Sequence, residues 1–445
     1  MLRISCLCLA IAAATPLWAQ VEPSGSGGGS SLDDTQMMTP APVSGGSYPG
    51  TVGSEERSNY LAGGLVFTGA YVNNLMVGNG TSPISDETYS FVPAIGFDRK
   101  TPRQDESVNY SAGFTLYQHT SEFNSVAQSA SGSSQFHISK YLVLDLRDTF
   151  QQNNNLYNQS NPFTGGGSGV SGTPGQTNGV VISPFENELS NSSSAGIHYQ
   201  YGRNAMIGAS GSYSFQKYSE STNVTGLNNE GTAGSSGFFS RRVGGPNYVG
   251  VTYQFSKFVT HPIDTYTLTH TLLGFYTYYF TRSFSVSILG GPEHYTNWGA
   301  TGPSQGAWTP AVVGSFGWQT LRANVAASYS HLVSGTGGLI GTYHSDLADL
   351  RGRLALSRKW SAGADVNYSR FDSVSSNLGV AYGTGGNSIL GAISLDHPIT
   401  EKLIVEAGYG HLHQYYAGIA SASTYPDSNR ANISIMYQFN RPLGR

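Results

Sequence analysis

Cysteine is nearly absent from this chain, which has two among its 445 residues, Cys6 and Cys8. Both lie in an N-terminal segment that begins Met-Leu-Arg, continues as an apolar run from Cys6 to Leu17 and reaches Ala19 at the expected cleavage point. This is the pattern of a secretory signal, and the run is too short for a membrane-spanning helix. We therefore expect residues 1–19 to direct export across the inner membrane and the exported chain to lack disulfides and thiolate chemistry.

Charged residues and long apolar runs are also scarce. Only 11% of the residues are charged, against about 25% in ordinary soluble proteins. Without Arg3 the chain has 22 basic and 27 acidic residues, a net charge of −5 (22 − 27) with no basic stripe, so nucleic acid is not an expected partner. After the signal no apolar run approaches the roughly 18 residues of a membrane helix, and the mean hydropathy is −0.23.

What the chain does have is residue-by-residue alternation of apolar and small polar side chains. In Val108–Leu116, which reads V-N-Y-S-A-G-F-T-L, every second residue is apolar and the residues between are Asn, Ser, Gly and Thr. Because successive side chains of a strand point to opposite faces, such a segment has one apolar and one polar face. The pattern recurs from about Tyr60 onward and predicts about 18 strands, with 16 possible because four of them alternate poorly.

The connections between these segments alternate between short and long. Gly202–Asn204, Thr281–Ser283 and Ser357–Lys359 are tight and turn-like, whereas connections such as Asn153–Ser192 are long. A soluble β-sandwich has no reason to separate loops by length, but a membrane barrel has short periplasmic turns and long extracellular loops. We therefore predict an all-β fold, a closed antiparallel transmembrane β-barrel over residues 58–439. Residues 20–57, rich in Gly, Ser and Pro, are expected to be a disordered periplasmic tail, and residues 440–445 a short C-terminal periplasmic tail.

The chain resembles outer-membrane β-barrels of the porin type from diderm bacteria. The likeness lies in the architecture and in the closing segment, whose alternating apolar residues end on an aromatic residue: Ile433, Ile435, Tyr437 and Phe439. The resemblance implies that these residues form the signal recognised by the barrel-assembly machinery. It departs from the family in that six residues follow Phe439. It further implies an outer-membrane location, contact with outer-membrane lipid, small polar solutes as partners and a possible homo-oligomer.

Charged residues on the polar faces are candidates for setting the selectivity of the lumen. By alternation the inward-facing ones are Asp145, Arg147, Arg351, Arg353 and Asp365. In general porins the loop after the fifth strand folds into the lumen, and Asn153–Ser192 matches it in position and length, with Glu186 and Glu188 available to line a constriction. Acidic residues opposite basic ones would set a transverse field that favours polar solutes. Two alternatives remain: the loop lies on the surface, and the wall charges pair with each other.

No catalytic or metal-binding pattern is evident. His411 and His413 share one face of a strand and could be half of a metal site, but they continue a lipid-facing series to the outer rim, where amphipathic rings commonly lie. No local signature marks a nucleophilic serine. We therefore expect neither enzymatic activity nor a metal or cofactor.

The leading interpretation is a channel for passive diffusion of small hydrophilic solutes through the outer membrane. Two alternatives come from other classes. One is a non-conducting scaffold or surface-binding barrel, and the other is the outer-membrane component of a polymer export system, with residues 20–57 contacting a periplasmic partner.

Overall fold

A computed structural model gives the arrangement of most of the residues after position 58. It describes the following ranges: 59–75, 83–153, 188–218, 228–244, 247–261, 265–281, 284–298, 305–320, 322–335, 342–374, 385–400, 402–417 and 426–442. The predicted signal peptide and the predicted N-terminal tail lie outside them and stay predictions. Within these ranges, no helix has the length and apolar character needed to cross a membrane.

The described chain consists of strands and one turn of 3-10 helix, η1 (Ser121–Phe123). The strands are β1 (Asn59–Val72), β2 (Asp86–Lys100), β3 (Gln104–Tyr117), β4 (Ser125–His137), β5 (Leu142–Asn153), β6 (Glu188–Gln200), β7 (Ala205–Tyr218), β8 (Asn229–Arg242), β9 (Asn247–His261), β10 (Thr265–Thr281), β11 (Phe284–Trp298), β12 (Gln305–Gln319), β13 (Ala323–Ser334), β14 (Tyr343–Ala355), β15 (Ser361–Ser373), β16 (Gly385–Pro398), β17 (Leu403–Ala417) and β18 (Asp427–Pro442). At 12 to 17 residues each, they exceed the 9–11 residues that a tilted strand needs to cross the hydrocarbon.

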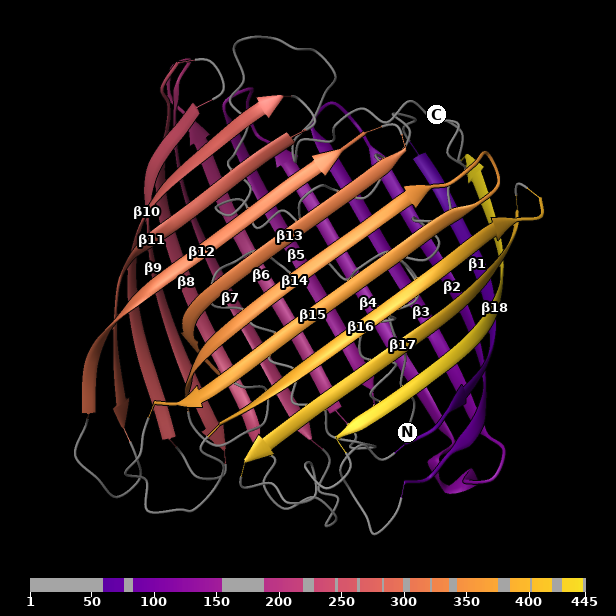
Figure 1. Cartoon of the computed structure of the whole chain (residues 1–445). Helices are drawn as coiled ribbons and strands as arrows, with labels where there is room; N and C mark the ends of the chain where they lie inside the picture. The colour runs from indigo at the N-terminus through magenta and orange to yellow at the C-terminus, as the bar shows by residue number, and fades with distance from the viewer. Residues whose placement is uncertain are drawn as a thin grey trace.

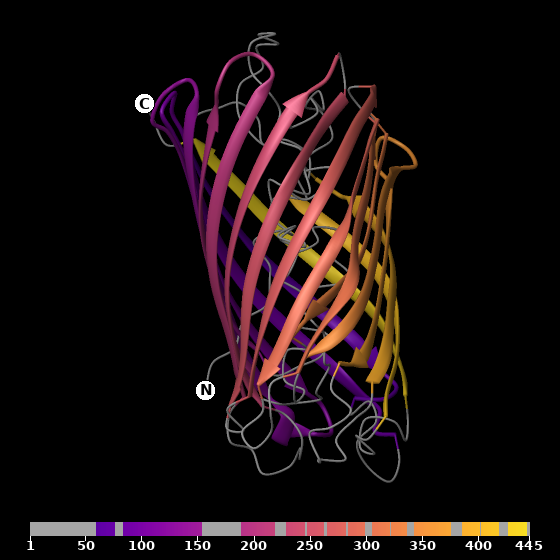
Figure 2. The same ribbon diagram turned by 90° about the vertical axis from the view of Figure 1, so that its left-hand side faces the viewer.

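The strands form one closed antiparallel ring. Each strand pairs with its neighbours in sequence, and β1 closes the ring by pairing with β18 from Tyr60 opposite Pro442 to Val72 opposite Arg430. Figures 1 and 2 show the tilted strands of this ring from two sides. The structure confirms the predicted fold class and fixes the strand number at 18. Closure gives every strand a paired neighbour on each side, which is the condition for a sheet to span a bilayer.

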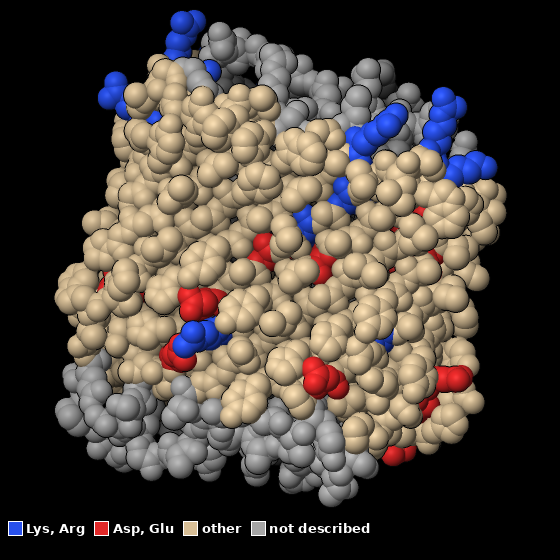
Figure 3. Space-filling view, in the orientation of Figure 1, with Lys and Arg blue, Asp and Glu red and all other residues tan. Residues whose placement is uncertain are grey.

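The outer face of the ring is apolar. Side chains with large exposed apolar surfaces occupy alternate positions, such as Leu65 and Phe67 on β1, Val108 and Tyr110 on β3, and Ile433 and Ile435 on β18. Figure 3 shows the face in front as largely uncharged, with Lys and Arg gathered along its upper edge. The exposed apolar belt faces lipid, because a closed barrel is one of two structures that satisfy their backbone groups inside a bilayer.

The two ends of the ring differ in the length of their connections. At one end, neighbouring strands are joined by two to five residues, as between Thr281 and Phe284. At the other end most connections are longer, up to the one from Asn153 to Glu188, although only three residues separate His261 from Thr265. Two predicted boundaries are wrong. The long loop ends at residue 187, because Glu188–Ser192 pairs with β5. The last strand extends to Pro442, because the three residues after Phe439 pair with β1.

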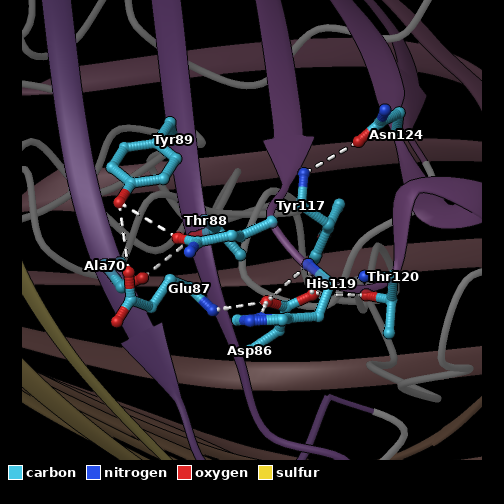
Figure 4. A network of polar contacts seen from close by, with 10 residues as sticks. Ala70, Asp86, Glu87, Thr88, Tyr89, Tyr117, His119, Thr120 and Asn124 are labelled. Atoms are coloured by element: carbon cyan, nitrogen blue, oxygen red, sulfur yellow. Dashed lines mark hydrogen bonds and ion pairs between the residues drawn. The ribbon is translucent and has the colours of Figure 1, made fainter.

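A buried carboxylate at the start of β2 binds the connection between β3 and β4 (Figure 4). Asp86 accepts hydrogen bonds from the backbone N–H groups of His119 (3.1 Å) and Thr120 (2.9 Å) and from the Thr120 hydroxyl (2.6 Å). The Asn124 side chain accepts a further bond from the Tyr117 N–H (2.8 Å). These bonds fix the connection between β3 and β4, which would otherwise leave donors without partners.

Candidate functional site: the inner wall of the barrel

The strand register places most of the predicted site residues on the inner face. Residues opposite each other in neighbouring strands share a face, and the apolar outer series identifies the other face as the inner one. Arg147 lies opposite Ser133 and Ser194, and Arg351 lies opposite Ala326 and Asp365. The same counting places Asp145, Glu188, Arg353 and Asp365 on the inner wall. Glu186 lies outside the described residues.

The guanidinium of Arg351 lies between two carboxylates on β14 and β15. Its Nε is 3.0 Å from Asp349 Oδ1 and 3.9 Å from Asp365 Oδ1. Both acidic side chains are less exposed than the arginine, at 14% and 17% against 24%. The wall charges therefore do pair with each other here, as one of the sequence alternatives predicted. Pairing offsets the cost of removing them from bulk water.

A second group of charges continues the first across β14, β16 and β17. Arg353 Nη2 lies 2.6 Å from Asp396 Oδ2, which also accepts a bond from the Ser361 hydroxyl at 3.1 Å. Asp396 lies opposite Glu406 in the register, and Glu406 is 1% exposed. We call Asp349, Arg351, Arg353, Asp365, Asp396, Glu406 and Arg430 the charged strip. Sequence analysis missed Asp396, Glu406 and Arg430, although alternation along β16, β17 and β18 places them on the inner face.

Another pair of predicted residues lies on the opposite side of the ring. Asp145 and Arg147 are on β5, nine strands from β14 in a ring of 18, and Figure 1 shows β5 on the wall behind β14. Asp145 lies 3.1 Å from His198 Nδ1 and accepts a bond from Gln135 at 2.7 Å. Most other inward residues of this wall are small and polar, such as Ser111 and Ser129. The charged strip therefore occupies one side of the lumen, opposite this isolated group on β5.

Apolar clusters interrupt the polar inner wall, which alternation did not predict. Leu273 and Phe275 of β10 pack with Leu289 of β11, Ala311 of β12 and Leu332 of β13. Leu273 and Leu289 are completely buried. The signal for this cluster is the adjacent pair Leu272-Leu273, where the inward series changes from threonine to large apolar residues. Because large apolar residues interrupt the polar inward series at Leu273 and Phe275, apolar–polar alternation does not identify the inner face in this part of β10.

The outer end of the β13–β14 hairpin leaves the wall and lies inside the ring. The Val333 N–H donates to Glu293 Oε2 on β11 at 2.9 Å. The hydroxyl groups of Thr342 and Thr267, the latter on β10, are 2.5 Å apart. A Cβ at Gly335 would overlap the Glu230 carboxylate on β8. Since these partners belong to strands two to five positions away around the ring, the hairpin crosses their inner faces and narrows the lumen.

A second covering of the inner wall lies near β16 and β17. Leu75, which follows β1, packs with Val72, Tyr117, Ala392 and Leu412. Leu412 is completely buried. Parts of the mouth are therefore formed by apolar packing over the inner face and not by the wall alone. The predicted constriction by the loop after β5 concerns residues 154–187, which lie outside the described ranges, and it stays a prediction.

The paired histidines lie on the outer face near the rim. His413 Nδ1 is 2.8 Å from Asp427 Oδ1, and His411 Nδ1 is 2.8 Å from Asn429 Oδ1. Tyr409, on the same face, donates to Asn429 Oδ1 at 2.7 Å. In the described part of the chain, no group of three or more His, Cys, Asp or Glu side chains could hold a metal ion. The geometry fits an interfacial belt of amphipathic rings with polar partners.

Comparison with known proteins finds solved structures that are similar to this barrel at low sequence identity. No protein-family model and no curated protein matches the chain. Among solved structures, OprD of Pseudomonas aeruginosa is similar with a TM-score of 0.40 and 11% identity over 87% of this chain and 98% of that one. OpdK of the same organism, solved with vanillate, gives 0.40 and 9% over 86% and 99%. The ferric citrate transporter FecA gives 0.43 and 11% over 86% and 64%.

Proposed function

We propose that this protein is a channel of the bacterial outer membrane through which small hydrophilic solutes diffuse passively. The observation that carries the proposal is the closed ring of 18 strands, apolar outside and largely polar inside. Rings of about 8 strands are filled by their own side chains, whereas rings of 16–18 leave an aqueous lumen. The predicted signal sequence and the closing strand β18 support the outer-membrane location.

The charged strip is the proposed selectivity element. Its four carboxylates and three guanidinium groups lie along one side of the lumen, and the smaller Asp145–Arg147 group lies opposite. A solute between them experiences a transverse field, which orients polar molecules. For solutes that carry both a charge and a dipole, the free-energy cost of entering this part of the lumen is therefore small. The strip is close to neutral in sum (four acids, three bases), so its effect on ion preference depends on each arginine.

Planar-bilayer recording of the refolded protein tests the proposal. A conducting lumen predicts discrete current steps in the unmodified protein. The matched variant lacks residues 154–187, with β5 and β6 joined by a short turn. Steps that appear only in this variant would mean that the segment plugs the barrel. No steps in either protein would contradict a channel and favour the non-conducting scaffold.

A further inference from the structure

The pairing between β12 and β13 ends halfway along β12 and three residues before the end of β13. Only Val312–Gln319 of β12 pairs with β13, although β12 begins at Gln305. The seven residues from Gln305 to Ala311 pair with β11, and among the described residues nothing pairs with their other edge. Here the end of β13 (Leu332–Ser334) has turned into the ring, as the bond from the Val333 N–H to Glu293 shows. As far as the described residues go, the wall is therefore open between β12 and β13 toward the end with long connections.

The sequence of β12 suits an unpaired edge. Pro310 has no N–H to donate, and proline in a sheet is largely confined to edges, first residues and bulges. Gly306, Ala307 and Pro310 are all exposed, and Trp308 is 71% exposed. Ala307 faces inward and Trp308 faces outward, so the first residues of β12 are exposed on both faces, whereas Ala311, next to the paired half, is buried.

The opening extends across the outer boundary of the hydrocarbon layer. Trp308 and Trp318 lie on the outward face of β12, ten residues apart, about the length that a tilted strand needs to cross the hydrocarbon. Tryptophans mark the two interfaces of a membrane barrel. Since open strand edges are not tolerated in contact with lipid tails, the free edge of β12 lines a space that water reaches from the lumen.

We propose that this opening is a lateral portal through which a single-chain amphiphile with a charged head passes between the lumen and the outer leaflet. The exposed side chains of Ala307, Trp308 and Pro310 at the edge of β12 provide an apolar surface for the alkyl chain. The buried cluster of Leu273, Phe275, Leu289, Ala311 and Leu332 adjoins the opening on the inside. The charged strip starts on β14, beside β13, and provides partners for the head group. The portal rests on the proposed function because it requires a water-filled lumen.

Cysteine pairs test the opening directly, because the predicted mature chain has no cysteine. If the sheet continued in register, Thr309 would lie opposite Ser334. The matched control is Ser315 opposite Ser328, a pair that the structure places in register. Both pairs face inward and, being six residues apart, occupy the same type of ladder position. We expect T309C/S334C to resist disulfide formation under mild oxidation that links S315C/S328C. Equal linking of the two pairs would overturn the portal.

Transport through the bridged protein tests the use of the opening. A bismaleimide long enough to span T309C/S334C is attached in vesicles. Flux is then measured for a fluorescent alkyl sulfonate, whose fixed charge keeps it from crossing bare lipid, and for a small neutral sugar. The portal predicts loss of sulfonate transfer with unchanged sugar flux, and no effect of bridging S315C/S328C. Unchanged sulfonate transfer, or joint loss of both fluxes, would overturn it. Absence of sugar flux before bridging would instead contradict the proposed channel.

Discussion

The side-chain size at single positions sets how closely neighbouring strands of this barrel approach. At Gly291 of β11 a Cβ would lie 1.9 Å from the backbone oxygen of Leu272 and 3.2 Å from Leu273 Cα. Both obstacles are backbone atoms, which cannot rotate away. At the preceding position, Gly290, the nearest atom to a Cβ would be 3.9 Å away. Of the two adjacent glycines, only Gly291 is needed for the close approach of β10 to β11.

The substitution Gly291→Ala is expected to destabilise the barrel, and Gly290→Ala is its matched control. Overpacking of this kind costs about 1–3 kcal/mol, because β10 and β11 must move apart. The measurement is the temperature at which the folded form disappears in a heat-modifiability gel, together with urea unfolding in detergent. Equal stability of the two variants would contradict the close approach at Leu272.

At the same scale, alternation alone predicted the orientation of Asp145, Arg147, Arg351, Arg353 and Asp365. The period of two fixes the face of every residue once one outward residue is known. It could not predict the partner of each charge, since partners depend on the register between strands. Asp396 and Arg353, for example, belong to strands that are not sequence neighbours, yet their side chains meet at 2.6 Å.

At the scale of elements, the strands and most of the alternation of short and long connections could be predicted from turn residues and the apolar–polar pattern; the three-residue connection between His261 and Thr265, at the end with long connections, is the exception. The inward course of the β13–β14 hairpin could not. Leu332-Val333-Ser334 continues the pattern of a wall strand, and only long-range partners redirect it. Chief among them is Glu293, whose carboxylate accepts from the Thr271 hydroxyl at 3.0 Å as well as from the Val333 N–H.

Replacing Glu293 by alanine is expected to release the hairpin from the inner wall. The change leaves the Val333 N–H without its acceptor, which destabilises the inward position of the hairpin by about 1–3 kcal/mol. Single-channel recording should show larger and noisier currents than in the unmodified protein. In Glu293→Gln the amide oxygen keeps the role of acceptor, so its currents should stay closer to the original. Identical current amplitude and noise in Glu293→Ala and the unmodified protein would show that this contact does not hold a constriction.

At the scale of the whole molecule, the ring separates two environments and distributes charge unevenly inside. Closure of β1 on β18 directs one set of alternate residues to lipid and the other to the lumen. The charged strip lies on β14 to β18, and the apolar cluster lies on β10 to β13. A solute passing along the axis therefore meets different chemistry on different sides, which a uniform polar wall would not offer.

The reversal potential across a salt gradient tests the central claim that the charged strip lines a conducting lumen. We predict that Arg351→Gln combined with Arg353→Gln shifts ion preference toward cations, because Asp349, Asp365 and Asp396 lose their positive partners. The shift should shrink at high salt, where charges are screened. Arg370→Gln is the control, since Arg370 faces outward and pairs with Asp372 at 3.0 Å. A reversal potential that stays unchanged in the double variant, or that moves equally in the control, would contradict the account.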